Sequence, residues 1–455
     1  MPLHLEALNS TIAQFLMEVH VVSKADNQKH AVAALDTLHD ESHSLASSSV
    51  RVWPLLIALT SNNLSYARGG DLLHWWDTYP VPAALSAPYN DQKSWGIVPA
   101  WGFGVVTESS TDISRGTLLW GFWPTANIPV SLQLQPSKPK GYWAETSESR
   151  QRLMTIYNIY SEEGRIDLPE TMPTTSIASL LGEDTLNRLA WTTLFRPIWQ
   201  TGYLLSRHTF TSSPASLLPV HPLGIDRPWT ATDADISAAV VISLSASSKT
   251  ARSFAYHMFR RSSAEERPLG FLQVSQTPEL LEAVPEKLVT DVPAKAVKYE
   301  QVGEAMEWIG GLKPARIVLV DFGARAGTLV RFVDAIEGHS NFGGAKTTIV
   351  NVGSEQKVYS TDDIKENRAS MQTMGKIQFN TSAVRDTAIR QTSADDYYAH
   401  VQPVWDDWLR VSHDIMPDIR VTLGWGVSGE EGIERGWSRL CQGSVDTQEG
   451  LVYTM

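Results

Sequence analysis

The sequence predicts an α/β protein in which a compact β-barrel-like unit precedes a doubly wound parallel sheet with helices on both faces. Short apolar runs separated by turn residues fill residues 51–135, and strand-like and helix-like segments alternate over residues 238–353. Such alternation favours a parallel sheet, because each crossover helix packs against a face of the sheet. A chain of 455 residues is long enough for two or three domains.

Three apolar runs predict the barrel-like unit. VWPLLIALT ends at the polar SNN and predicts a buried strand. GIVPAWGFGVVTES contains Pro99, Gly102 and Gly104, which are typical of strands that bend or approach closely. TLLWGFWPTANIPVSLQL alternates in part and predicts one or two further strands. Residues 145–210 are predicted to be mostly helical, because SESRQRLMTIYNIYSEE has apolar residues at helical spacing.

The second half of the chain supplies the parallel sheet. The predicted strands are AAVVISLS, LGFLQVS, ARIVLVDFG and TTIVNVGS, and the helices between them include SSKTARSFAYHMFRR, EQVGEAMEWIGGL and TLVRFVDAIEG. SADDYYAHVQPVWDDWLRV and EEGIERGWSRLCQG predict two later helices, and GLVYTM predicts a closing strand. The proline- and serine-rich SSPASLLPVHPLGIDRPW has no period and predicts a connection between domains.

Composition narrows the function classes. A net charge of -12 argues against a general nucleic-acid binder, which would normally carry a basic excess. The single cysteine, Cys441, excludes a disulfide within the chain and a multi-cysteine zinc site, and favours a reducing, cytoplasmic location. No secretory signal and no long apolar span is present, so no membrane partner is expected. Polar residues 1–50 contain His20, His30, His39 and His43, but no helical stripe supports a metal site there.

The turn after the first predicted strand is the candidate site for a dinucleotide phosphate. In a doubly wound sheet this turn usually carries glycines, which let the backbone approach the pyrophosphate at a helix N-terminus. Here the three corresponding positions hold Ser245, Ser248 and Ala251, all of them small, and Lys249 adds a cation. A serine-capped helix start without a ligand explains the same residues.

The end of the second strand bears on which dinucleotide would bind. An acidic residue there would hold the ribose of NAD, but QVSQT contains none. Lys249 and Arg252 would neutralise a 2′-phosphate, so NADPH is the expected cofactor. Asp321, in the predicted strand ARIVLVDFG, lies near the expected cleft. An aspartate at such a position caps a turn more often than it binds a ligand. The candidate cofactor-binding residues are Ser245, Ser247, Ser248, Lys249, Thr250 and Ser275.

A family resemblance follows from these motifs. VRVWPLLIALTSNNLSYA, VPAWGFGVV and RGTLLWGFWPTA occur in the order of the N-terminal domain of medium-chain dehydrogenases/reductases, and AAVVISLSASSKTA, ARIVLVDFG and TTIVNVG resemble their nucleotide-binding domain. SNNLSYA, YNIY, LFRPIWQTGYLL and SLSASSKTA together resemble an uncharacterised branch of that superfamily, a domain of unknown function. The resemblance covers most of residues 50–355 and about the last 25.

The resemblance implies a GroES-like β-barrel catalytic domain joined to a Rossmann-like doubly wound domain. The predicted domains are residues 1–224 with a helical insertion at about 145–210, residues 225–380 for nucleotide binding, and residues 381–455 returning to the catalytic domain. Zinc-dependent members have a cysteine near Asn62 and a Gly-His-Glu near Gly102. This chain has neither and lacks the four-cysteine lobe, so no catalytic or structural zinc is expected.

Zinc-free relatives are quinone and enoyl reductases, and the resemblance therefore implies NADPH-dependent reduction of an enone, enoyl or quinone-like substrate, in secondary (polyketide) metabolism. The candidate catalytic residues are Tyr66, Tyr79 and Asn63, since a tyrosine hydroxyl can stabilise an enolate or protonate carbon. Tyr157, Asn158 and Tyr160 form the branch motif YNxY, as cleft residues or as a structural lock.

Two other functions stay open at this point. A protein of the same fold can catalyse an isomerisation, cyclisation or lyase reaction without a dinucleotide. Its acid–base groups would be Tyr66, Asp71, His74 or Asp77. A non-catalytic binding or assembly protein is the third alternative. TTIVNVG would then be an edge strand for a homodimer, although a plain internal strand explains it equally well.

Overall fold

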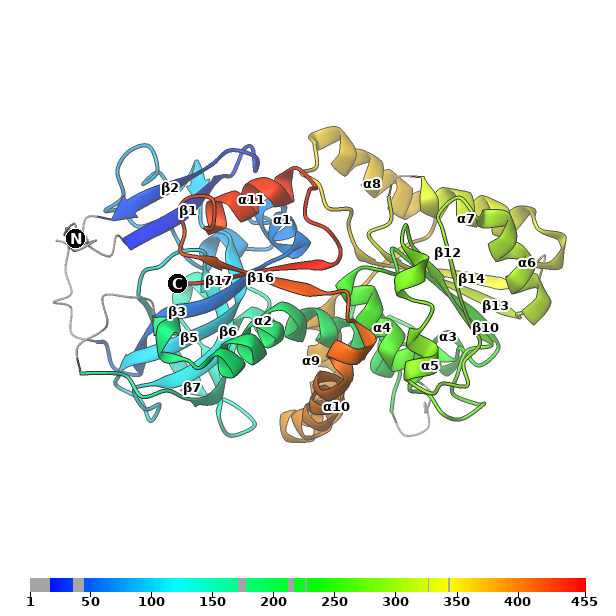
Figure 1. Cartoon of the computed structure of the whole chain (residues 1–455), viewed down its shortest axis with the longest axis horizontal. Coiled ribbons are helices and arrows are strands. Elements are labelled where there is room, and N and C mark those ends of the chain that lie inside the picture. The colour runs from blue at the N-terminus through cyan, green and yellow to red at the C-terminus, as the bar shows by residue number, and fades with distance from the viewer. Residues whose placement is uncertain are drawn as a thin grey trace, which may run out of the picture.

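The computed structural model describes residues 17–35, 45–170, 177–211, 217–225, 227–325, 327–342 and 344–455. One lobe contains the strands of the barrel, and the other contains the parallel sheet (Figure 1). Helix α2 (Glu183–Leu204) runs between the two lobes. No helix in these ranges is long and apolar enough to cross a membrane.

The barrel lobe is a ring of six strands. They pair in the order β3 (Ser49–Leu59), β5 (Pro99–Ser109), β6 (Thr117–Pro124), β9 (Ile159–Arg165), β8 (Tyr142–Glu145) and β7 (Val130–Pro136), and β7 pairs back with β3. This last pairing closes the sheet and removes its edges. Two C-terminal strands extend it: β17 (Glu449–Thr454) pairs antiparallel with β3, and β16 (Arg420–Trp425) pairs parallel with β17.

Two parts of this lobe differ from the sequence prediction. Residues 145–165 are not a helix: two short 3-10 turns, Glu148–Arg150 and Thr155–Asn158, lead into β9. The helical spacing misleads because Tyr160 packs on Gly121 of β6, where an added Cβ would lie 2.1 Å from the ring. In the N-terminal segment, β1 (Met17–Ser23) pairs with β2 (His30–Leu35) and β4 (Trp95–Gly96). The polar composition of residues 1–50 did not predict these strands.

The second lobe contains six parallel strands. Their order is β12 (Ala294–Val297), β11 (Gly270–Val274), β10 (Ala239–Leu244), β13 (Arg316–Phe322), β14 (Lys346–Gly353) and β15 (Ile377–Gln378). Counted from β10 this is 3-2-1-4-5-6, the order of a doubly wound dinucleotide-binding sheet. The predicted fold class is therefore confirmed. Strand β14 lies between β13 and β15, so it is internal, and a homodimer remains a prediction.

Helices cover both lobes. They are α1 (Ser61–Arg68), α3 (Ala231–Ala234), α4 (Lys249–Phe259), α5 (Val284–Lys287), α6 (Val302–Leu312), α7 (Thr328–Gly338), α8 (Thr361–Thr373), α9 (Thr381–Gln391), α10 (Ala394–Ile415) and α11 (Ile433–Cys441). The first turn of α4 follows β10 directly, as the sequence predicts.

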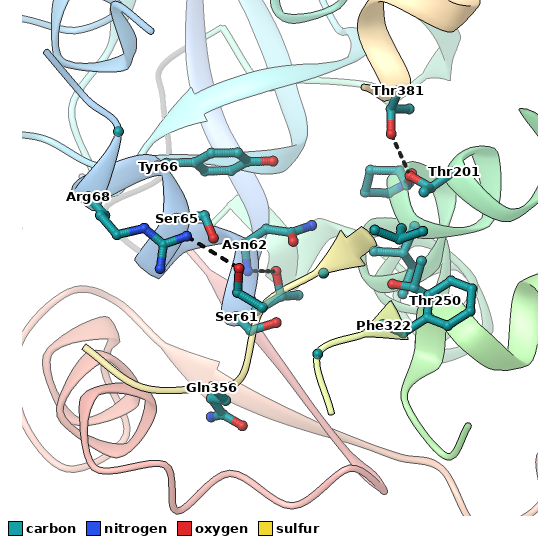
Figure 2. A pocket seen from close by; sticks show the side chains of 18 of the residues that line it. Ser61, Asn62, Ser65, Tyr66, Arg68, Thr201, Thr250, Phe322, Gln356 and Thr381 are labelled. Carbon is teal, nitrogen blue, oxygen red and sulfur yellow. Dashed lines mark hydrogen bonds between the residues drawn. The ribbon is translucent and has the colours of Figure 1, made fainter. Parts of the chain in front are cut away.

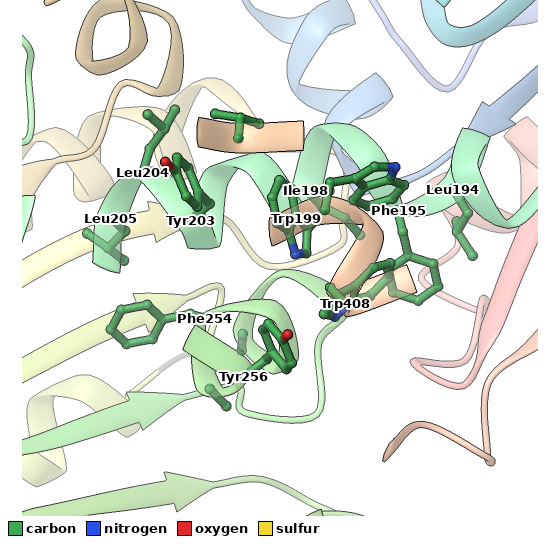
Figure 3. Close-up of a cluster of buried hydrophobic side chains, with 14 of the residues drawn as sticks. Leu194, Phe195, Ile198, Trp199, Tyr203, Leu204, Leu205, Phe254, Tyr256 and Trp408 are labelled. Atoms are coloured by element: carbon green, nitrogen blue, oxygen red, sulfur yellow. The ribbon is translucent and has the colours of Figure 1, made fainter. Parts of the chain in front are cut away.

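A continuous apolar cluster joins the lobes. Side chains from α2, α4 and α10 meet in it, including Trp199, Phe254 and Trp408 (Figure 3). Gly202 of α2 lets the two helices touch, because an added Cβ would lie 2.7 Å from the backbone nitrogen of Phe254. Large apolar interfaces hold domains in one arrangement. The cleft between the lobes is therefore fixed by packing.

Candidate functional site

A cavity between the two lobes has a volume of about 990 Å³. It lies where the carboxyl ends of β10, β13 and β14 face α1 of the barrel lobe. Tyr66 and Arg68 on α1 stand across it from Thr250 and Phe322 (Figure 2). In doubly wound sheets the ligand site lies at this point, where the strand order reverses.

The turn that starts α4 forms one wall. Ser245 has φ of 59°, a left-handed conformation that glycine adopts at little cost and serine rarely adopts. The turn thus keeps the backbone shape for which glycine is usually selected. The Ser248 side chain caps α4 by accepting from the Ala251 amide at 3.3 Å. Lys249 and Thr250 open the helix, so their N–H groups are among those with no carbonyl partner inside it.

Four of the six predicted cofactor residues line this cavity: Ser245, Ser248, Lys249 and Thr250. Ser247 is buried below the turn. Ser275 is also buried, and its hydroxyl accepts from the Thr277 amide at 3.1 Å. Neither residue is part of the cavity wall, so we leave both out of the proposed cofactor contacts.

The two cations expected near a 2′-phosphate are engaged in intramolecular contacts. Lys249 Nζ donates to the Thr447 carbonyl at 2.9 Å and to the Glu449 carbonyl at 2.6 Å. Burial, followed by the charge of Arg252, lowers the pKa of Lys249 to about 8. Arg252 forms a bidentate ion pair with Asp418, with distances of 2.7 and 2.6 Å. Asp418 occupies both terminal nitrogens of the Arg252 guanidinium, so we leave Arg252 out of the proposed phosphate contacts.

The ends of the other strands complete this wall. Asp321 caps a turn by accepting from the amides of Gly323 at 3.0 Å and Ala324 at 2.8 Å. Gly323 has φ of 102°, and an added Cβ would lie 2.5 Å from the Ser354 carbonyl. Gln356 Nε2 lies in the same wall, is buried and has no hydrogen-bond partner among the described residues. It offers a donor to a ligand.

The barrel wall is aromatic and contains Tyr66. Its ring packs against Trp75 and Tyr157, with centroids 4.7 and 5.7 Å apart. Trp101 Nε1 donates to the Tyr66 hydroxyl at 3.2 Å. All four side chains line the cavity. Burial raises the pKa of Tyr66 to about 12, so the phenol stays protonated at neutral pH.

The other two candidate catalytic residues lie elsewhere. Asn63 is part of the capping box of α1: its Oδ1 accepts from the Thr60 amide at 2.7 Å, and its Nδ2 donates to the Pro99 carbonyl at 3.0 Å. The Tyr79 hydroxyl donates to the Phe122 carbonyl at 2.7 Å, in a buried network outside the cavity wall. Neither residue has a part in the chemistry proposed below, because backbone partners occupy their polar atoms.

The YNxY motif is divided between the two roles that the sequence left open. Tyr157 lines the cavity. Asn158 Nδ2 donates to the Arg150 carbonyl at 3.0 Å, and the Tyr160 hydroxyl accepts from Arg150 Nη1 at 2.8 Å. Of the three residues Tyr157, Asn158 and Tyr160, Tyr157 alone lines the large cavity.

No group of three metal-ligating side chains occurs within the described ranges. Asn62 lines the cavity. At Gly102 an added Cβ would lie 1.8 Å from the Leu56 carbonyl, so the barrel leaves no room for a side chain there. His20 Nε2 lies 3.0 Å from His30 Nδ1. His39 and His43 fall outside the described residues.

Arg68 was not recognised in the sequence. It lies at the end of α1, and its Nη2 donates to Ser354 Oγ at 3.4 Å across the cavity. Its guanidinium also lies over the Tyr359 ring, at 4.4 Å. The sequence around Arg68 does not indicate this contact, because Ser354 follows Arg68 by almost 290 residues. The contact connects the two lobes at the mouth of the cavity.

Comparisons with known proteins place the chain in a family. A family model described as "Protein of unknown function (DUF2855)" matches residues 57–446. No curated protein matches the sequence. Among solved structures, the complex of Etr1p with NADP and crotonyl-CoA has 10% identity and a TM-score of 0.48, and covers 97% of this chain and 100% of its own.

Two further structures have a similar relationship to the chain. CurA from Vibrio vulnificus in complex with NADPH has 9% identity and a TM-score of 0.46, covering 96% of this chain and 99% of its own. A mutant form of enoyl thioester reductase from Candida tropicalis has 10% identity and a TM-score of 0.46, covering 97% and 100%. At these identities and TM-scores the likeness carries no argument about function.

Proposed function

The chain belongs to the DUF2855 family of proteins of unknown function, and we propose that it is an NADPH-dependent, zinc-independent oxidoreductase that reduces an enone, enoyl or quinone-like small molecule. The observation that carries the proposal is the cavity of about 990 Å³ between the turn that starts α4 and an aromatic wall. Its size is at the upper end of the range for small-molecule sites. A cofactor on one wall and a planar substrate on the other would fit this arrangement.

The residues present suit a dinucleotide. The amides of Lys249 and Thr250 and the partial positive charge of the α4 N-terminus would hold the pyrophosphate. The hydroxyls of Ser245 and Ser248 add donors, and the unpartnered Gln356 Nε2 adds another. When bound, the dinucleotide would supply a hydride, while the protein supplies position and electrostatics.

Tyr66 is the proposed proton donor. Its oxygen accepts from Trp101, and its hydrogen would be donated to the substrate. A hydrogen bond from Tyr66 to the substrate carbonyl would stabilise the enolate that forms when hydride adds to the double bond. Tyr66 would then protonate the carbon next to the carbonyl and recover its proton from solvent. The rings of Trp75, Trp101 and Tyr157 would exclude water from the reacting atoms.

The choice between NADPH and NADH rests on one feature. QVSQT, at the end of β11 and in the turn after it, contains no carboxylate that would bind the ribose hydroxyl of NAD. Lys249 and Arg252 are both engaged, so neither is a dedicated ligand for a 2′-phosphate. We therefore expect a preference for NADPH of less than about tenfold, equivalent to roughly 1.4 kcal/mol.

A binding titration tests the proposal. NADPH and NADH are added to the purified protein, and energy transfer from tryptophan to the reduced nicotinamide is followed. We expect saturable binding that weakens about tenfold in Lys249→Ala, because the variant removes a positive charge close to the proposed pyrophosphate site. Lys346→Ala is the matched control, because Lys346 is exposed and lies at the amino end of β14, whereas the cavity lies at the carboxyl end. If neither NADPH nor NADH binds at millimolar concentrations, the proposal is overturned. Substrate turnover without added nucleotide would favour an isomerase, cyclase or lyase.

A further inference from the structure

A second, smaller cavity lies behind the aromatic wall. Its volume is about 60 Å³, and it is enclosed by α2, α9, α10 and strands β8 and β9. Three residues line both this cavity and the large one: Trp101, Ile156 and Pro197. The two spaces are therefore neighbours, with the Trp101 indole between them.

Arg385 of α9 faces this small cavity with a buried charge. The residue is 5% exposed, and its Nε has no hydrogen-bond partner among the described residues. The nearest carboxylate oxygen belongs to Asp386 and lies 3.6 Å from Nη2, beyond hydrogen-bond distance. A guanidinium has five N–H donors and stays charged in proteins. The ion pair with Asp386 leaves the buried Nε without an acceptor, and an unsatisfied buried donor is costly, so a carboxylate oxygen would suit this group.

The acidic groups nearby are already engaged. Glu163 accepts from Arg196 at 2.5 Å and from Ser161 at 2.7 Å, which neutralises the second arginine of the cavity. Asp386 accepts a hydrogen bond from Thr155. Arg385 is therefore the side chain here with donors to spare.

The size and the walls of the cavity define the ligand. A volume of about 60 Å³ is several times what one water needs, roughly 10–15 Å³, but far less than a nucleotide needs. A planar carboxylate matches the fork of a guanidinium in a bidentate contact. Aromatic rings form much of the remaining wall, namely Trp101, Trp120, Tyr142, Trp199, Tyr398 and Trp405. The matching ligand is a carboxylate at the end of an apolar or planar group.

We propose that the small cavity binds the carboxylate of an acidic small molecule through Arg385, and that this molecule is the substrate. The second part rests on the proposed function. Trp101 lines the small cavity and donates to Tyr66 at 3.2 Å on the side of the large cavity. A substrate that reaches past this ring would place its carboxylate on Arg385 and its double bond beside Tyr66.

The first experiment tests the carboxylate site without a nucleotide. The full chain is titrated with sodium acetate, and with acetamide and sodium chloride at matched concentrations, while tryptophan fluorescence is recorded. We expect a saturable change with acetate alone. Arg385→Gln should weaken acetate binding at least tenfold. Arg390→Gln should not, because Arg390 is an exposed arginine of the same helix.

Equal responses to acetate and acetamide, or unchanged acetate binding in Arg385→Gln, would overturn the site. If Arg385→Gln does not fold, Arg385→Lys is tested instead. The lysine keeps the positive charge but cannot form the bidentate contact of a guanidinium. The acetate–acetamide contrast in the unmodified protein tests for a carboxylate-selective site, and the Arg385 variant assigns that site to Arg385.

The second experiment asks whether the carboxylate belongs to the substrate. NADPH-dependent reduction of 4-oxopent-2-enoate is compared with reduction of its primary amide. We expect a KM at least tenfold lower for the acid, and Arg385→Gln should remove this difference while changing kcat less than threefold. Equal KM values for acid and amide would overturn the substrate assignment. Acetate binding without reduction of either compound would retain the carboxylate site and overturn the proposed function.

Discussion

The two walls of the large cavity differ in how their polar groups are used. On the wall of the parallel sheet, Lys249 and Arg252 are both held by other parts of the chain, and the backbone of the Ser245 turn is left to contact a ligand. On the barrel wall, the rings around Tyr66 leave one hydroxyl hydrogen available. Cofactor recognition should therefore depend mainly on backbone shape, and the proposed chemistry mainly on one side chain.

The largest expected effect is on the barrel wall. Tyr66→Phe removes the proposed proton donor, and we expect kcat to fall about 100-fold or more, the low end for general acid–base catalysis. The Kd for NADPH should change little. Steady-state kinetics and the tryptophan titration measure the two quantities. Tyr79→Phe is the matched control, because Tyr79 donates to a backbone carbonyl outside the cavity. A kcat equal to that of the unmodified protein in Tyr66→Phe would exclude the assigned role.

A similarly large effect on stability is expected from Arg252. Arg252→Ala leaves Asp418 without its buried partner, and we expect the free energy of unfolding to fall by about 3 kcal/mol. Urea denaturation measures this change. The double variant Arg252→Met with Asp418→Leu should recover most of the loss, because it removes both charges. A specific loss of NADPH binding with unchanged stability would instead assign Arg252 to the cofactor.

A smaller effect should follow from the shape of the turn. Ser245→Gly suits φ of 59°, so NADPH binding should persist and the protein should be as stable or more stable by up to about 1 kcal/mol. Ser245→Val places a β-branched residue in the same conformation and should weaken NADPH binding severalfold. The pair separates backbone shape from the hydroxyl. Loss of binding in Ser245→Gly would show that the hydroxyl matters more.

The smallest effect concerns pH. Burial lowers the pKa of Lys249 to about 8, so its positive charge is lost as the pH rises through that value in the free protein. A bound pyrophosphate favours the charged form, so the Kd for NADPH should be flat below pH 7 and should rise above pH 8, by at most tenfold per pH unit. Lys249→Met should abolish this slope. Tyr66, with a pKa raised to about 12, should add no slope in this range.

The sequence predicts the framework well because β-strand and helix periods are local. The runs AAVVISLS and ARIVLVDFG became the central strands β10 and β13. The turn at Ser245 and the placement of Tyr66 on the cleft came from the motifs around them. Periodicity failed at YNIY, where the packing of Tyr160 on Gly121 overrides helical spacing and favours a strand.

The side-chain partners were not predictable from local sequence. Lys249 is bonded to carbonyls 198 and 200 residues away, and Arg252 to a carboxylate 166 residues away. No local pattern reveals that these cations are engaged. Arg385 also shows no signal in its own helix, since its cavity is assembled from α2, α10 and the barrel strands. The chain brings these groups together only when the lobes pack.

A crystal structure of the protein grown with saturating NADPH is the most direct measurement of the central claim. We predict the pyrophosphate on the amides of Lys249 and Thr250, and the nicotinamide ring between that turn and Tyr66. Ordered NADPH at another surface, or electron density at the turn explained fully by protein side chains, would contradict the claim that this serine turn is a dinucleotide site.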